Sequence, residues 1–325
     1  MRRWMHLPFA ALAMATALAA GAVQTSAQDY PARPVRIVVG FPAGAAGDLV
    51  SRVMAAHLSH IMGQQFLVEN RPGASSNIAT EQAARAEKDG YTLFLGTVAN
   101  VVNAAVSSKL SFDFARDFAP IALIATVPVA LVVHPSTGAR NVNELLSVAK
   151  SKPGQLNYAS SGVATTPHLA GALMNVKAGV QLVHVPYQGS APAMTDLVAG
   201  RTHVMFSAVS VVMPHIRSGA LRALALAAPK RSNLLPNLPT VAEVGLPELD
   251  ASIWFGLMAP AGTPQPILNR LGAAINALLK SDAVSAQLAA MGYEPLGGSA
   301  GDFTRYVDVE LKKWTLAAEA AGVRN

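Results

Sequence analysis

The sequence contains no cysteine among its 325 residues. Disulfide bonds and lipid attachment through a lipoprotein cysteine are therefore excluded, so burial of the core has to stabilise the fold. The sequence also lacks a run of lysine and arginine, because its 25 basic residues are scattered and only slightly outnumber its 19 acidic residues. Nucleic acid is not an expected partner, whereas a weak positive excess favours small anions.

Motifs that carry common enzymatic chemistry are missing as well. The G-x-G-x-x-G dinucleotide loop, the G-x(4)-G-K-[ST] phosphate loop and the metal-binding H-E-x-x-H are absent, and the G-x-S-x-G sequence at 297–301 does not follow a predicted buried strand, as the elbow of esterases does. His57 and His60 stand three apart on a predicted helix, but no third metal ligand accompanies them. We expect no metal, no cofactor and no catalysis, and the poverty of catalytic side chains favours binding without turnover.

The N-terminus reads as an export signal. A basic start, MRRWMH, precedes the apolar run LPFAALAMATALAAGAV and the small residues that end at Ala27. Pro8 and Thr16 interrupt the apolar run, which favours cleavage over a membrane anchor. We expect residues 1–27 to be removed near Ala27 and the mature protein to lie in the periplasm.

Residues 28–325 are too many for one typical core and suit two α/β lobes. The order of predicted elements has the chain start one lobe, build a second and return to the first. We place the first lobe at 28–126 plus 251–325 and the second at 127–250. This path has two crossings between the lobes, which is the layout of a hinged clamshell.

The stretch 35–52, VRIVVGFPAGAAGDLVSR, predicts a buried strand at 35–39, a loop of small residues and a helix. The start of such a helix has unpaired N–H groups and a positive dipole end, so the loop suits a carboxylate or a phosphate. Asp48 caps the helix or meets a ligand ammonium in this interpretation. A plain strand-to-helix turn with Asp48 as N-cap is the alternative.

Further predicted strands at 65–69, 91–95 and 156–160 alternate with helices, which indicates mostly parallel sheets in both lobes. Ligands of such sheets sit at the carboxyl ends of the strands, where Ser75 and Thr97 fall. The apolar stretch 117–136, broken by Pro128, predicts one or two strands that pass between the lobes.

A second junction follows the strand at 156–160. Small and hydroxyl-bearing residues, SSGVATTPH, fill 160–168, and a helix is expected from Thr165 or Thr166. Two facing helix starts from different lobes would grip one carboxylate between N–H and hydroxyl donors. Ordinary turn and capping chemistry is the alternative. His168, beside this loop, either donates to a ligand or makes a structural bond.

With these residues laid out, the chain resembles the solute-binding receptors of tripartite tricarboxylate transporters, also called the Bug family, over essentially its whole mature length. The motifs that carry the resemblance are YPARPVRIVVGFPAGAAGD, VENRPGASSNIA, DGYTLFLGT, DFAPIALIA, NYASSGVATTPHLAG, HVPYQGSAPAMTDLVAG and WFGLMAPAGTP. The resemblance implies a two-lobed periplasmic-binding-protein fold of type II, working as a monomer.

In function, the resemblance implies a receptor that closes on a small organic carboxylate, such as a dicarboxylate, a tricarboxylate or an aromatic acid, and presents it to membrane permease subunits. A ligand-sensing receptor for a membrane kinase stays open as an alternative. So does an exported hydrolase in which Ser161 and His168 form the reactive pair.

The expected ligand-binding residues lie in the two loops and at the strand ends. They are Phe41, Ala43, Gly44, Ala45, Asp48, Ser75, Asn77, Thr97, Ser160, Ser161, Gly162, Thr165, Thr166, His168 and Ser207. Ala45 and Ala164 stand where the family often has glycine, and we expect an ordinary negative φ at both. Ser207 stands where the family often has aspartate, which weakens selection for a ligand that carries an ammonium group.

Overall fold

The computed structural model describes residues 30–107, 109–187 and 189–324. The predicted export signal at 1–27 lies outside the described residues. None of the described helices combines the length and the apolar character needed to cross a membrane.

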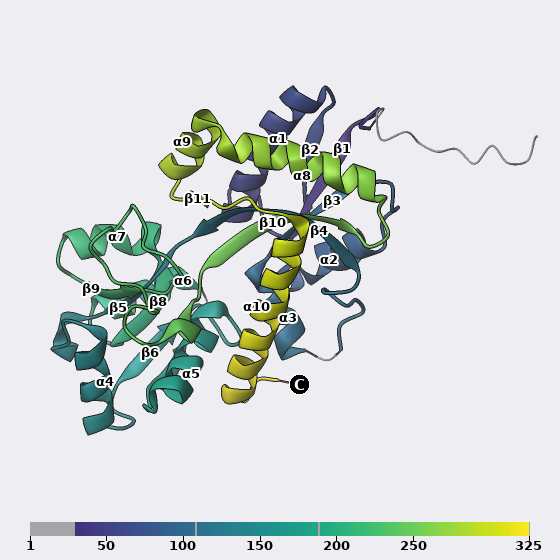
Figure 1. The fold of residues 1–325 in the computed structure, drawn as a ribbon. Helices are drawn as coiled ribbons and strands as arrows, with labels where there is room; N and C mark the ends of the chain where they lie inside the picture. Colours follow the sequence, from purple (N-terminus) through teal and green to yellow (C-terminus); the bar gives the residue numbers. More distant parts are fainter. Residues whose placement is uncertain (1–29, 108, 188, 325) are drawn as a thin grey trace, which may run out of the picture.

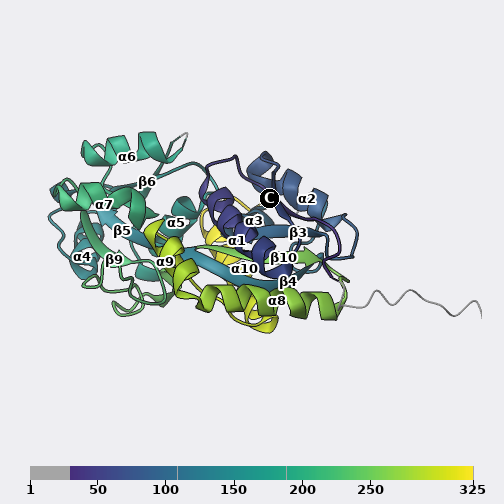
Figure 2. The ribbon, with the colours of Figure 1, turned by 90° about the horizontal axis from the view of Figure 1, so that it is seen from above.

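Two β-sheets organise the chain, and they lie side by side in both views (Figures 1 and 2). The first sheet has six strands, in the order β11 (Glu294–Pro295), β4 (Phe118–Val127), β10 (Ile253–Pro260), β3 (Thr92–Thr97), β1 (Val35–Val39) and β2 (Phe66–Asn70). The second has five strands, in the order β7 (Val183–Pro186), β6 (Asn157–Ser160), β8 (Val204–Ala208), β5 (Val129–Val133) and β9 (Arg222–Leu226).

Helices flank both sheets. Those associated with the first sheet are α1 (Ala46–Met62), α2 (Asn77–Ala84), α3 (Val98–Val106), α8 (Gln265–Lys280), α9 (Asp282–Ala290) and α10 (Ala300–Ala320). Those associated with the second are α4 (Val142–Ser151), α5 (Thr166–Ala178), α6 (Ser190–Val198) and α7 (Val209–Arg217). The predicted alternation of strands and helices is confirmed, although α3 and α6 were not among the predicted helices.

The sheets are mixed, so the expectation of mostly parallel sheets is wrong. In the first sheet β1 is parallel to β2 and β3, whereas β10 runs antiparallel to both β3 and β4. In the second sheet β5 is antiparallel to β8 and β9. The physical reason in the first sheet is the path of the chain, because it leaves along β4 and returns along the adjacent strand β10 in the opposite direction.

The two strands β4 and β10 carry the chain between the sheets. Pro128, which has no N–H to donate to a ladder, separates β4 from β5 as predicted. Ile253 at the start of β10 pairs with Val127 at the end of β4. The two crossings therefore lie next to each other, while the limits of the lobes stay a prediction.

Helix α10 connects the two halves by packing. It contacts α3 and β4 of the first half and α5 of the second, and Figure 1 shows it running past both halves. One hydrophobic core includes Phe94 of the first sheet, Leu131 of the second and Trp314 of α10. Two further hydrophobic cores lie on the opposite faces of the two sheets. One lies between the first sheet and helices α1 and α8, and the other between the second sheet and helices α6 and α7.

A buried carboxylate fixes α10 to the returning strand. Glu310, 2% exposed, accepts hydrogen bonds from the indole N–H of Trp254 at 3.1 Å and of Trp314 at 2.9 Å. Lys313 pairs with the same carboxylate and donates to the main-chain oxygen of Asp250 at 2.6 Å. The charge is therefore both neutralised and hydrogen-bonded, as a buried ion requires.

The substitution Glu310→Leu should lower the free energy of unfolding by roughly 3–5 kcal/mol, because it leaves two indole N–H groups without an acceptor and removes the carboxylate that pairs with Lys313. Urea denaturation measures this loss. The control Glu310→Gln keeps an acceptor and should cost less than half as much. Equal stability of wild type and the leucine variant would show that the network does not hold α10.

Candidate functional site

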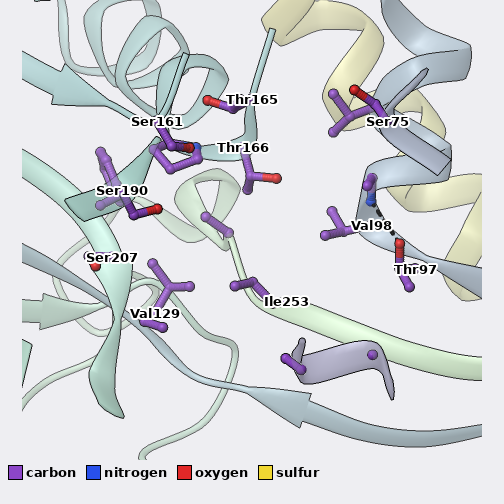
Figure 3. A pocket seen from close by; sticks show the side chains of 18 of the residues that line it. Ser75, Thr97, Val98, Val129, Ser161, Thr165, Thr166, Ser190, Ser207 and Ile253 are labelled. Atoms are coloured by element: carbon purple, nitrogen blue, oxygen red, sulfur yellow. Dashed lines mark hydrogen bonds between the residues drawn. The ribbon is translucent and has the colours of Figure 1, made fainter. Parts of the chain in front are cut away.

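A cavity of about 340 Å³ lies between the two halves. Phe41, Val98 and Phe255 line it from the first half, and Ser161 and Phe206 from the second. Figure 3 shows Ser75, Thr97 and Val98 on one side and Ser161, Thr166 and Ser190 on the other. None of the described residues that line it is ionisable at neutral pH, so charged side chains do not form this wall.

Helix N-termini converge on this cavity. Its wall includes the first residues of α1, α3, α5 and α6, together with Ala208, the N-cap of α7. The N–H groups of a first turn have no partner inside the helix, and the aligned peptide dipoles make that end positive. Anion binding is therefore favoured here without lysine or arginine.

Hydroxyl groups add further donors. In the described part of the chain, no hydrogen bond engages the side chains of Ser75, Ser161, Thr166, Ser190 or Ser207. All of these residues line the cavity. A bound molecule would therefore meet hydroxyls that can donate without first breaking a protein hydrogen bond.

Asp48, in the first turn of α1, supports the loop before this helix and lies outside the cavity wall. Its Oδ2 accepts from the Gly44 N–H at 2.8 Å, and its Oδ1 accepts from Asn70 at 2.9 Å. Arg52 also donates to the carboxylate, at 3.0 Å. The N-cap position belongs to Ala45, so Asp48 shapes the loop from inside the first turn.

Burial by itself would raise the pKa of Asp48, but the hydrogen bonds from Arg52, Gly44 and Asn70 outweigh it and lower that pKa below its usual value. The carboxyl group is therefore ionised at neutral pH. With the carboxylate committed to Gly44, which has φ +83°, Asp48 acts on the backbone of the loop.

The loop before α5 repeats this arrangement with a different side chain. His168, like Asp48, is the third residue of its helix and reaches back four residues. Its Nδ1 accepts from the Ala164 N–H at 3.0 Å. Ala164 has φ +58°, as Gly44 has a positive φ in the first loop. Both loops are thus held at a left-handed residue by a buried acceptor from the helix that follows.

The expectation of an ordinary φ is confirmed at Ala45, which has φ −72°, and is wrong at Ala164. A left-handed alanine costs about 1–2 kcal/mol. The bond from Ala164 to His168 and the bond from the Thr165 hydroxyl to the Gly162 oxygen, at 2.7 Å, hold the turn despite this cost. Local pattern reasoning missed these partners because they form only once α5 is in place.

The structure brings some predicted site residues to the cavity wall and leaves others behind it. On the wall are Phe41, Ala45, Ser75, Thr97, Ser161, Thr165, Thr166 and Ser207. Outside the wall are Ala43, Gly44, Asp48, Asn77, Ser160, Gly162 and His168. Asn77 supports the wall indirectly, because its Oδ1 accepts from Asn103, a lining residue, at 2.8 Å.

Sequence reasoning missed several lining residues. Ser190 follows Gly189 at the start of α6, and the same pattern of a small residue before a helix could have revealed it. Val129, Ile253 and Phe255 come from strands near the crossings, and no local pattern marks them as cavity residues.

A stack of two histidines supports the second loop. The rings of His168 and His184 are 3.8 Å apart and nearly parallel, and the Tyr158 ring lies 5.0 Å from that of His184. His184 Nε2 lies 2.6 Å from the Ser160 hydroxyl. Burial lowers the pKa of His168, and burial together with His168 lowers the pKa of His184 to about 4.

His168 and Ser161, the reactive pair of the hydrolase alternative, are not hydrogen-bonded to each other in the described part of the chain. His168 Nδ1 instead accepts a hydrogen bond from the Ala164 N–H. Within the same described ranges, no group of three or more histidine, aspartate and glutamate side chains is arranged to hold a metal ion.

The substitution Asp48→Ala should lower the free energy of unfolding by about 1–3 kcal/mol, because the N–H of Gly44 and the amide of Asn70 lose a buried acceptor. Urea denaturation is the measurement. Asp308→Ala, on an exposed position of α10, is the control and should change stability by less than about 0.5 kcal/mol. A similar small change in both variants would contradict the role of Asp48.

His184 should make stability depend on pH between its ordinary pKa of 6.5 and its value of about 4 in the fold. In this window the unfolded chain binds more protons, so the contribution of His184 is complete above pH 6.5 and is lost as the pH falls toward 4. Thermal melts across this range should show a smaller decline for His184→Gln, which keeps a partner for Ser160 without titrating. Parallel curves for the two proteins would refute the assignment.

Comparison with known proteins agrees with this geometry. The sequence profile of the tripartite tricarboxylate transporter family receptors matches residues 50–323. A solved structure described as R. palustris Rpa4515 with adipate is 38% identical, with a TM-score of 0.74, and the match covers 90% of this chain and 99% of that one. The comparison confirms the two-lobed fold.

Two other structures support the same assignment. MatC from Rhodopseudomonas palustris with bound malate is 30% identical, has a TM-score of 0.70, and matches over 89% of this chain and 100% of its own. The periplasmic binding protein BugD is 31% identical, has a TM-score of 0.70, and matches over 91% and 99%. The chain therefore belongs to the receptor family of the tripartite tricarboxylate transporters, whose members bind solutes.

Proposed function

We propose that this receptor captures a small organic carboxylate in the cavity between its halves and delivers it to membrane permease subunits without chemical change. The observation that carries the proposal is the convergence of the N-termini of α1, α3, α5 and α6 on a cavity without ionisable wall residues. Such a site supplies N–H and hydroxyl donors to an anion.

The rest of the wall indicates the remainder of the ligand. Val98, Val129, Ile253 and Phe255 present apolar surface, so a hydrocarbon body fits beside the polar donors. A volume of about 340 Å³ is at the small end of ligand pockets. Relatives with bound adipate and malate support a carboxylate of this size.

Closure of the two halves about the crossings β4 and β10 would bring the starts of α1 and α5 together on one carboxylate group. In this proposal the lobes are 28–126 plus 251–325 and 127–250, and α10, which belongs to the first lobe, also contacts α5 of the second. Export through the segment 1–27 would place the receptor in the periplasm, where the permease can meet it.

Thermal denaturation of the mature protein against a panel of carboxylates tests the proposal. A ligand at a hundred times its Kd should stabilise the fold by about 2.7 kcal/mol. The panel should include adipate, malate, citrate and benzoate, with adipamide as the uncharged control. A panel without any stabilising acid, or equal stabilisation by adipamide, would overturn the proposal.

Variants locate the site in the same assay. Thr166→Val removes a hydroxyl from the cavity wall and should raise the Kd of the best acid roughly tenfold, a loss of about 1.4 kcal/mol. Thr304→Val, on the exposed side of α10, removes a hydroxyl that bonds only to its own helix and is the matched control.

A further inference from the structure

The two stacked histidines behind the second loop, His168 and His184, make hydrogen bonds that side chains serving only to fill space would not make. His168 is 5% exposed, and its ring stacks on the ring of His184 at 3.8 Å. Each ring touches a different end of the loop, since His168 bonds Ala164 and His184 bonds Ser160. Apolar side chains of the same size would fill the space but make neither bond.

The proton positions on His168 follow from its partner. A main-chain N–H donates to Nδ1, so Nδ1 carries no proton and the proton of the neutral ring is on Nε2. Protonation of Nδ1 would remove the acceptor of the Ala164 N–H, which has no second one among the residues that the structure describes. The loop conformation therefore depends on one tautomer of one ring.

The first loop supplies an independent comparison. Asp48 and His168 occupy the same position in their helices and accept from the N–H group four residues earlier. The residues that donate, Gly44 and Ala164, both have positive φ. Glycine tolerates that conformation, whereas alanine does not favour it, so the second loop needs its acceptor more than the first does.

The residues after Ala164 are the ones that face the cavity. Ala164, Thr165 and Thr166 line it, and α5 begins at Thr166. A turn that relaxed at Ala164 would change the direction of the donors at the start of α5. We propose that His168 and His184 are positioning residues that hold the loop at 160–166 in its ligand-binding shape.

This inference rests on the proposed function for its effect on affinity, but its structural part is tested without ligand. Isotope-labelled wild-type protein is measured by NMR for the tautomer of His168 and for hydrogen exchange of the Ala164 amide. We expect an unprotonated Nδ1 and a protected amide. A proton on Nδ1, or an amide that exchanges as fast as an unstructured one, would overturn the inference.

Two variants separate the hydrogen bond from simple packing. In His168→Asn the side-chain oxygen takes the place of Nδ1, whereas His168→Leu keeps the volume and loses the acceptor. The leucine variant should exchange the Ala164 amide at least tenfold faster and bind adipate at least tenfold more weakly. The asparagine variant should stay within threefold of wild type in both measurements.

His203→Leu is the matched control. His203 is a partly buried histidine of the same half that bonds Asn157, and among the described residues no hydrogen bond joins it to the loop at 160–166, so its loss should leave the Ala164 amide and the adipate affinity unchanged. Wild-type behaviour in His168→Leu would overturn the inference. If the wild type itself binds no carboxylate, the proposed function fails, and the exchange measurements alone decide the role of His168.

Discussion

Unpaired amides at the starts of helices are the constraint from which the site follows. Every helix leaves its first N–H groups without partners, and a buried helix start needs an acceptor from somewhere. In this protein several helices begin at one cavity, so their donors face the same small volume. In the proposed function the carboxylate oxygens of the ligand accept from these donors, and no arginine or lysine lines the described wall.

Such donors are useful only if the loops that carry them keep their shape. Each loop contains a residue with positive φ, and each is held by a side chain that reaches back from the helix it precedes. Asp48 does this as a carboxylate that forms an ion pair with Arg52, and His168 does it as a neutral ring. A neutral acceptor behind the second loop adds no negative charge close to an anionic ligand.

Much of this could be predicted from the sequence, because the loop residues and the helix starts are local. The small residues at 40–47 and the hydroxyls at 160–166 mark the two junctions without any knowledge of the fold. The antiparallel neighbours β4 and β10 could not be predicted, since their pairing follows from the return of the chain from the second half. The role of His184 could not be predicted either, because its partner Ser160 lies 24 residues earlier in the chain.

The position of α10 limits how the two halves can move. Because this helix packs against α3 and α5 at once, opening the cavity must slide one of these contacts over the side chains of α10. Packed side chains resist gradual sliding and favour a few discrete arrangements. Helix α10 therefore limits how far the two halves can separate, and the receptor should occupy a few distinct conformations rather than a continuous range.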